Sequence, residues 1–79
     1  DEYVEIKIGT DGTVYVIKDY YCAQIFDDEV EFSKVSYDGN KFVGENSLYE
    51  QITLNFNSDG TVAYTYGEND SITLTKSAD

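Results

Sequence analysis

The sequence contains no histidine, arginine, proline, tryptophan or methionine, and it has a single cysteine. Without an imidazole, neither a Ser-His-Asp triad nor a Cys-His pair can form, and a zinc site built from cysteine and histidine is excluded as well. No glycine-rich phosphate loop is present, because the chain has neither a GxGxxG nor a GxxxxGK[ST] motif. The sequence therefore predicts a non-catalytic protein without a cofactor.

Paired carboxylates are the remaining catalytic option, and Asp27, Asp28 and Glu29 supply candidates for cleavage of a glycosidic bond. Glycosidases hold two carboxyl groups about 5–9 Å apart in a cleft. A chain of 79 residues has little room to build such a cleft, so enzymatic activity is not expected.

The lone Cys22 excludes an intrachain disulfide. It lies in a nearly continuous run of aromatic and apolar residues (20–26), which predicts a small core residue rather than a reactive thiol. The localisation stays open, since a chain that starts at Asp1 without methionine fits both a reducing compartment and an exported protein whose leader has been removed. No apolar run approaches the roughly 20 residues that span a bilayer, so membrane insertion is not expected.

Sixteen acidic residues face five lysines, which gives a net charge of −11. Affinity for nucleic acids and anionic membranes comes from lysine and arginine that neutralise phosphates, so direct binding to either is not expected. A basic protein surface or a cation is the natural partner. Acidic surfaces also serve simply to keep proteins soluble, and this simpler interpretation stays open.

The clearest pattern is a phrase that occurs twice, at residues 8–14 and again at residues 56–62. Each copy has an apolar residue, a spacer, Thr or Ser, and then Asp-Gly-Thr-Val, between runs that alternate apolar and polar residues. This pattern is typical of a β-hairpin. With three-residue loops and left-handed glycines at Gly12 and Gly60, Ile8 faces Val14 and Phe56 faces Val62, which keeps the apolar residues of each hairpin on one face.

Two further segments show weaker strand patterns. Residues 29–37 and 41–43 flank the turn residues 38–40, and residues 71–76 follow a turn at 67–70. The sequence therefore predicts a single all-β domain (residues 1–79) of six to seven short strands, arranged as a small antiparallel meander, a partly open barrel or a sandwich.

Two stretches leave room for a short helical segment. Residues 19–28 fit a strand, an irregular crossing or a short helix capped by Asp19. Residues 47–51 begin with Ser47-Leu48-Tyr49-Glu50, which matches a capping box. The β-like sequence from Ile52 onward limits any helix there to about one turn.

The acidic stretch between the two repeated hairpins is the candidate binding site. Its tyrosines and carboxylates are Tyr20, Tyr21, Asp27, Asp28, Glu29 and Glu31. Carboxylates spread over a small β scaffold can imitate the phosphates of a nucleic acid and attract a basic protein, while tyrosines supply rigid contact area.

Three functional hypotheses follow. The first is a protein-binding or inhibitory module that presents this acidic, tyrosine-bearing surface to a basic partner, with a nucleic-acid mimic as its narrowest form. The second is a ligand-binding or spacer module of an exported or cell-surface bacterial protein. The third is a β domain stabilised by Ca²⁺ at Asp27, Asp28, Glu29 and Glu31, although their spacing is not that of an EF-hand.

Overall fold

The computed structural model of the protein describes residues 3–21 and 29–76. Within these ranges the chain forms strands and no helix, which confirms the all-β prediction. The seven strands are β1 (Val4–Ile8), β2 (Val14–Asp19), β3 (Val30–Asp38), β4 (Lys41–Glu45), β5 (Gln51–Phe56), β6 (Val62–Tyr66) and β7 (Ile72–Leu74).

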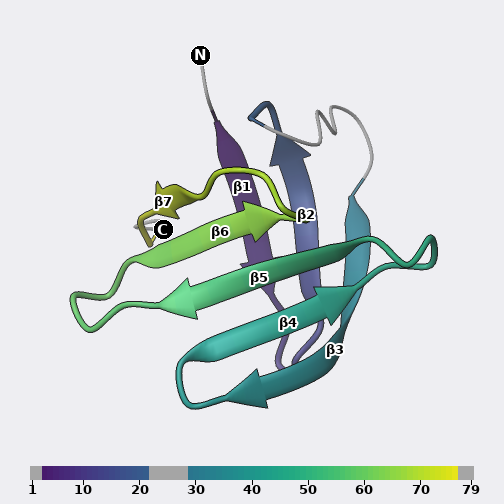
Figure 1. Ribbon diagram of the computed structural model, residues 1–79, viewed down its shortest axis with the longest axis horizontal. Coiled ribbons are helices and arrows are strands. Elements are labelled where there is room, and N and C mark those ends of the chain that lie inside the picture. Colours follow the sequence, from purple (N-terminus) through teal and green to yellow (C-terminus); the bar gives the residue numbers. More distant parts are fainter. Residues whose placement is uncertain (1–2, 22–28, 77–79) are drawn as a thin grey trace.

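The strands form one antiparallel meander in which every strand pairs with its neighbours in the sequence. The sheet bends at β3, because residues 30–32 pair with β2 whereas residues 33–38 pair with β4. Figure 1 shows the consequence: β1 and β2 run across the direction of β4, β5 and β6, and the sheet curls into a nearly closed barrel. The two end strands, β1 and β7, do not pair with each other.

The register of the two repeated hairpins is the one that the apolar pattern predicts. Ile8 pairs with Val14 across the first loop, and Phe56 pairs with Val62 across the second. Gly12 and Gly60 take the left-handed conformation, with φ of 87° and 92°. The three-residue loops therefore keep the apolar side chains aligned, because a shift of one residue would turn them to the other face.

A β-bulge in β2 changes which residues point into the barrel. Ile6 pairs with Val16 and Glu5 pairs with Lys18, so Ile17 is the extra residue. The alternation of side chains shifts by one at this point, and Asp19 faces inward and is fully buried. Its carboxylate accepts hydrogen bonds from the Tyr64 hydroxyl and the Tyr21 backbone N–H, both at 2.8 Å, which offset the cost of burying the acid.

The core is formed by inward-facing residues of six strands: Val4, Val14, Val16, Phe32, Phe42, Ile52, Leu54 and Tyr64. Gly44 is buried among them because the Phe42 ring lies over it. A Cβ atom at Gly44 would lie only 2.8 Å from Cε1 of Phe42 and 3.1 Å from Cβ of Phe32. The central hairpin is tighter than the expected loop of residues 38–40, since Asp38 pairs with Lys41 directly.

Neither expected helical position is helical in the described residues. The prediction for residues 47–51 is wrong: residues 46–50 form a hairpin turn between β4 and β5, since the strands on both sides pair in register up to Glu45 and Gln51. Asp19 ends β2, and residues 20–21 form a turn. The rest of the stretch 19–28, which includes Cys22, lies outside the described residues.

Candidate functional site

The two tyrosines of the predicted site, Tyr20 and Tyr21, lie in the turn after β2. The Tyr20 ring stacks against Tyr3, with centroids 6.2 Å apart and planes inclined by 30°. Tyr21 is partly buried against the core, and its hydroxyl donates a hydrogen bond to the Ser71 carbonyl at 3.4 Å. Both rings therefore pack at one end of the barrel, and Tyr21 connects β2 to the turn before β7.

Two of the four predicted carboxylates can be placed. Glu29 directly precedes β3 and Glu31 lies within it, and both are exposed. Asp27 and Asp28 lie outside the described residues. The Ca²⁺ hypothesis therefore lacks two of its four ligands in what the structure describes, and no group of three or more acidic side chains in residues 3–21 and 29–76 is arranged to hold a metal ion.

Glu31 lies directly opposite Tyr15 of β2, a residue outside the predicted site. Partial burial raises the pKa of Tyr15, and the negative charges of Asp11, Glu31 and Glu29 raise it further. Tyr15 and Glu31 thus share the outer surface of β2 and β3, and the charges of Asp11 and Glu29 act on the same tyrosine. We call Asp11, Tyr15, Glu29 and Glu31 the acidic face, and Lys7, paired with Tyr15 from β1, borders it.

Two features fix the side chains of the acidic face. The Tyr15 ring lies beside Gly9, where a Cβ atom would be 3.4 Å from Cε2 of Tyr15 and 3.0 Å from Oδ1 of Asp11. Oδ1 of Asp11 accepts a hydrogen bond from the backbone N–H of Thr13 at 2.9 Å. Hydrogen bonds from Thr13 hold the pKa of Asp11 below its ordinary value, so Asp11 is a carboxylate near neutral pH.

Sequence reasoning missed Tyr15 and Asp11 as members of this surface. The alternation of the first hairpin, with Val14 facing inward, predicts that Tyr15 faces outward, and the three-residue loop of this hairpin contains Asp11. The missing information was the pairing of β2 with β3, which sets Tyr15 beside Glu31. The alternation of each strand indicates that Tyr15 and Glu31 face outward. The sequence of either strand alone does not determine the register in which the two strands pair.

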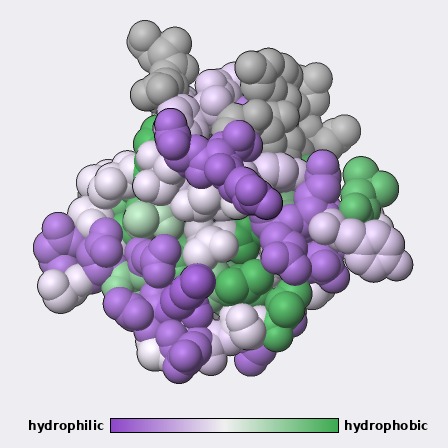
Figure 2. Space-filling view, in the orientation of Figure 1, coloured by the Kyte–Doolittle hydropathy of each residue, from purple (hydrophilic) through white to green (hydrophobic). Residues whose placement is uncertain are grey.

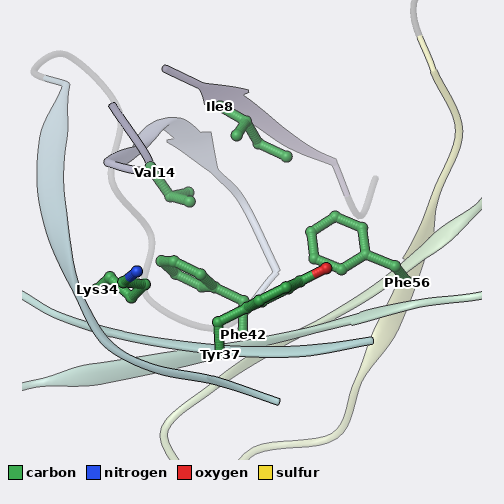
Figure 3. Close-up of a pocket in the computed structure, with 7 residues that line it drawn as sticks. Ile8, Val14, Lys34, Tyr37, Phe42 and Phe56 are labelled. Atoms are coloured by element: carbon green, nitrogen blue, oxygen red, sulfur yellow. The ribbon is translucent and has the colours of Figure 1, made fainter. Parts of the chain in front are cut away.

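A second candidate site is an apolar pocket of about 350 Å³ at the mouth of the barrel. Figure 3 shows Ile8 and Val14 of the first hairpin facing the rings of Tyr37, Phe42 and Phe56. The Tyr37 and Phe56 rings meet edge to face, with centroids 6.4 Å apart. The lining residues are Ile8, Gly12, Val14, Lys34, Tyr37, Phe42 and Phe56.

A second bulge shapes this pocket. Lys34 pairs with Gly44 and Ser36 pairs with Val43, so Val35 is the extra residue and is half exposed. The shift places Tyr37 opposite the core residue Phe42, on the side of β3 that faces the pocket. The pocket therefore offers apolar and aromatic surface with one ammonium group, Lys34, and no carboxylate among its lining residues. It suits an apolar group and holds no pair of groups for acid–base chemistry.

The chain was compared with protein-family models, with curated proteins and with solved structures, and none of the three comparisons finds a match. No helix long and apolar enough to cross a membrane occurs in the described part of the chain.

Proposed function

We propose that this domain is a non-catalytic protein-binding module that presents the acidic face to a basic partner. The observation that carries the proposal is the placement of Glu31 directly opposite the partly buried Tyr15, with Oδ1 of Asp11 beside the same ring at Gly9. With a net charge of −11, the whole domain attracts cationic surfaces over several ångströms and raises their association rate.

The acidic face combines two elements of a protein-binding surface. Its carboxylates can form charge-assisted hydrogen bonds with lysine and arginine. Tyr15 adds a large aromatic surface whose position is set by Gly9 and the neighbouring strands, so that little side-chain entropy is lost on binding. A nucleic-acid-mimicking inhibitor is the narrowest form of this proposal: such a partner would release the domain when duplex DNA or RNA competes for its basic surface.

The test uses two variants with the same net charge. D11N/E29Q/E31Q neutralises the acidic face and keeps an acceptor in the Asp11 turn, whereas D38N/E68Q/D70N neutralises three exposed residues elsewhere. Each removes three negative charges, so the net charge changes from −11 to −8 in both. Binding of immobilised domain to an array of purified basic proteins is measured by interferometry at increasing salt concentrations.

We expect the bound proteins to lose about tenfold in affinity for the acidic-face variant and less than about threefold for the control variant. Binding should also weaken between about 50 and 200 mM NaCl, where surface charges become screened. Equal losses in the two variants would show attraction by net charge alone, and unchanged binding to the acidic-face variant would contradict the proposal.

The pocket at the barrel mouth favours a second candidate, a module that binds an apolar ligand. Its aromatic lining and its volume match a small apolar group. A fluorescent hydrophobic probe such as anilinonaphthalene sulfonate would report binding, and Tyr37→Ala, which removes an exposed pocket residue, should lower its affinity about fivefold. Val35→Ala, an exposed residue of the same strand outside the pocket, is the matched control.

A further inference from the structure

The barrel is open along one seam. β1 and β7 are the ends of the seven-stranded sheet, and neither pairs with the other. A groove of about 940 Å³ separates them, lined by residues 3–8 on one side and residues 72–76 on the other. The outer edge of β1 therefore lines this open groove and pairs with no strand of the sheet, while its inner edge pairs with β2.

The backbone groups that face this seam can be identified from the hydrogen bonds of β1 to β2. The Gly9 N–H donates to the Thr13 carbonyl at 2.8 Å, and the Tyr3 carbonyl accepts from the Tyr20 N–H at 2.7 Å. Residues 3 and 9 therefore direct their backbone groups toward β2. Because the direction alternates along an antiparallel strand, the N–H and C=O groups of Val4, Ile6 and Ile8 point into the seam.

The sequence of β1 is complementary to itself when two copies pair in opposite directions. With Ile6 opposite Ile6 of a second copy, Val4 lies opposite Ile8, and Glu5 lies opposite Lys7. In this register the residues whose backbone groups face the seam form the hydrogen-bonded pairs. Glu5 and Lys7 then form the intervening pairs, where side chains approach most closely and opposite charges are favourable.

We propose that this edge of β1 is a dimerisation surface that pairs antiparallel with β1 of a second copy of the chain. The charge pattern selects that occupant. An open strand edge accepts many partners unless a charge restricts it. Lys7 disfavours a strand that places a cation opposite it and favours one that places a carboxylate there. A cation opposite Glu5, two residues away, is favoured for the same reason, and β1 itself provides both charges.

The net charge of the two copies opposes this pairing. Each carries −11, but charges further apart than about 8 Å are largely screened at physiological ionic strength. The Glu5–Lys7 pairs lie at contact distance and are screened less. Dimerisation should therefore strengthen as salt rises toward about 0.5 M, whereas binding of a basic partner to the acidic face should weaken. This opposite salt dependence separates the present inference from the proposed function.

The test exchanges the two charges. Analytical ultracentrifugation of the unmodified protein up to about 0.5 mM should show a dimer with a dissociation constant in the micromolar range, as expected for a small interface. Glu5→Lys and Lys7→Glu each create like-charge pairs and should weaken the dimer at least tenfold. The double variant E5K/K7E restores opposite charges and should dimerise again, and a mixture of the two single variants should form a heterodimer.

A peptide competitor tests the same pairing without altering the protein. A peptide with the sequence of residues 3–9 should dissociate the dimer, and the same peptide with its Glu and Lys interchanged should not. A monomer at about 0.5 mM in both 0.15 and 0.5 M NaCl would overturn the proposal. Single variants that dimerise like the unmodified protein would overturn it too, as would a mixture of single variants that stays monomeric.

Discussion

Residues 46–50 and residues 57–61 close neighbouring hairpins with the same backbone hydrogen bonds but with different side chains. In the first turn the Asn46 N–H donates to the Glu50 carbonyl at 3.0 Å, and the Tyr49 N–H donates to the Asn46 carbonyl at 3.1 Å. In the second turn the Asn57 N–H donates to the Thr61 carbonyl at 2.9 Å, and the Gly60 N–H donates to the Asn57 carbonyl at 3.1 Å. We call these the tyrosine turn and the glycine turn, after their left-handed fourth residues, Tyr49 (φ 65°) and Gly60 (φ 92°).

In each turn a side chain accepts a hydrogen bond from the backbone N–H of the fifth residue, but this side chain comes from a different position in each turn. In the glycine turn, Oδ1 of Asp59, the third residue, accepts the Thr61 N–H at 3.0 Å. The third residue of the tyrosine turn is Leu48, which has no acceptor. Oδ1 of Asn46, the first residue, accepts the Glu50 N–H at 2.9 Å instead. The shared backbone geometry therefore does not require Asp-Gly, provided that another side chain supplies the acceptor.

The tyrosine turn also carries strain and exposed apolar surface. An L-residue in the left-handed region costs about 1–2 kcal/mol, and the Tyr49 side chain is 82% exposed, so burial of its ring offsets little of this. Leu48 is 73% exposed, and Figure 2 shows an apolar patch at the end of the molecule where this turn projects. The side chain of Asn46, which accepts the Leu48 and Glu50 N–H groups, thus offsets part of this cost.

The largest expected effect comes from placing a β-branched residue at the left-handed position of the glycine turn. Gly60 has open space around it, so Gly60→Val causes no clash and its cost is that of the backbone conformation. We expect the free energy of unfolding to fall by about 2 kcal/mol, measured by urea denaturation. Ser58→Val, in the same turn at a position with negative φ, should change it by less than about 0.5 kcal/mol. Equal effects of the two would refute the backbone explanation.

A smaller effect is expected from removing the Asn46 side chain. Asn46→Ala deletes the acceptor for two N–H groups and the 2.8 Å bond from Nδ2 to the Glu50 carboxylate. We expect a loss of about 1.5 kcal/mol, since net hydrogen bonds at exposed sites contribute about 0.5–1.5 kcal/mol each and some are replaced by water. Asn57→Ala, at the equivalent position of the glycine turn, deletes one bond, to Oγ1 of Thr61, and should cost less.

The difference between the two turns should disappear when the Asp and Gly of the glycine turn are placed at the equivalent positions of the tyrosine turn. In an L48D/Y49G background, an aspartate occupies the third position and can accept the Glu50 N–H. Asn46→Ala should then cost only about 0.5 kcal/mol, so the mutations are not additive. An undiminished cost in this background would show that Asn46 acts through something other than the turn amides.

These turns also show how far the sequence predicts the fold. The two Asp-Gly hairpins and their registers follow from local alternation and turn chemistry, and both predictions are confirmed. In the tyrosine turn, the spacing of Ser47 and Glu50 matches a capping box and so predicts a helical turn that the structure does not contain. The side chain that accepts the backbone N–H groups of this turn belongs to Asn46, one residue before Ser47. A tyrosine at positive φ is too rare for sequence patterns to suggest.

The sequence does not predict the features that depend on contacts between residues far apart in the chain. The bulge at Ile17 has no local signal, yet it buries Asp19, whose partner Tyr64 lies 45 residues away. The acidic face needs the register of β2 against β3, two strands joined by a stretch with no clear pattern. Sequence reasoning therefore selected the carboxylates Glu29 and Glu31 but paired them with tyrosines adjacent in sequence rather than with Tyr15.

A third, still smaller effect is expected in the opposite direction. Tyr49→Gly removes the left-handed strain of the tyrosine turn but adds flexibility to the unfolded chain, which offsets part of the gain. The net result should be an increase of about 0.7 kcal/mol in the free energy of unfolding. Leu48→Gly, next to it at negative φ, adds the same flexibility without relieving strain and should destabilise the domain. Stabilisation by both variants would mean that loss of exposed apolar surface, not strain, is responsible.

The smallest expected effect is on stability at low pH, where a different carboxylate titrates in each of the two turns. Hydrogen bonds from the Thr61 side chain and backbone hold the pKa of Asp59 below its ordinary value, and those from Asn46 and Tyr66 do the same for the pKa of Glu50. A lowered folded-state pKa means that the unfolded chain takes up protons first as the pH falls. The stabilisation is therefore complete above the ordinary carboxyl pKa and is lost as the pH drops through the folded-state value.

Asp59→Asn keeps an acceptor for the Thr61 N–H but does not titrate, so the melting temperature of this variant should fall less steeply than that of the unmodified protein below about pH 4. At pH 7 the melting temperatures of Asp59→Asn and the unmodified protein should differ little, because residue 59 is exposed and solvent screens the charge of an aspartate there. Asn46→Ala should flatten the same acid limb through Glu50, whose carboxylate loses the hydrogen bond from Nδ2 of Asn46. If Asp59→Asn leaves the acid limb unchanged while Asn46→Ala flattens it, then of these two turns only the tyrosine turn couples folding to pH, and the two turns differ in electrostatics as well as in side chains.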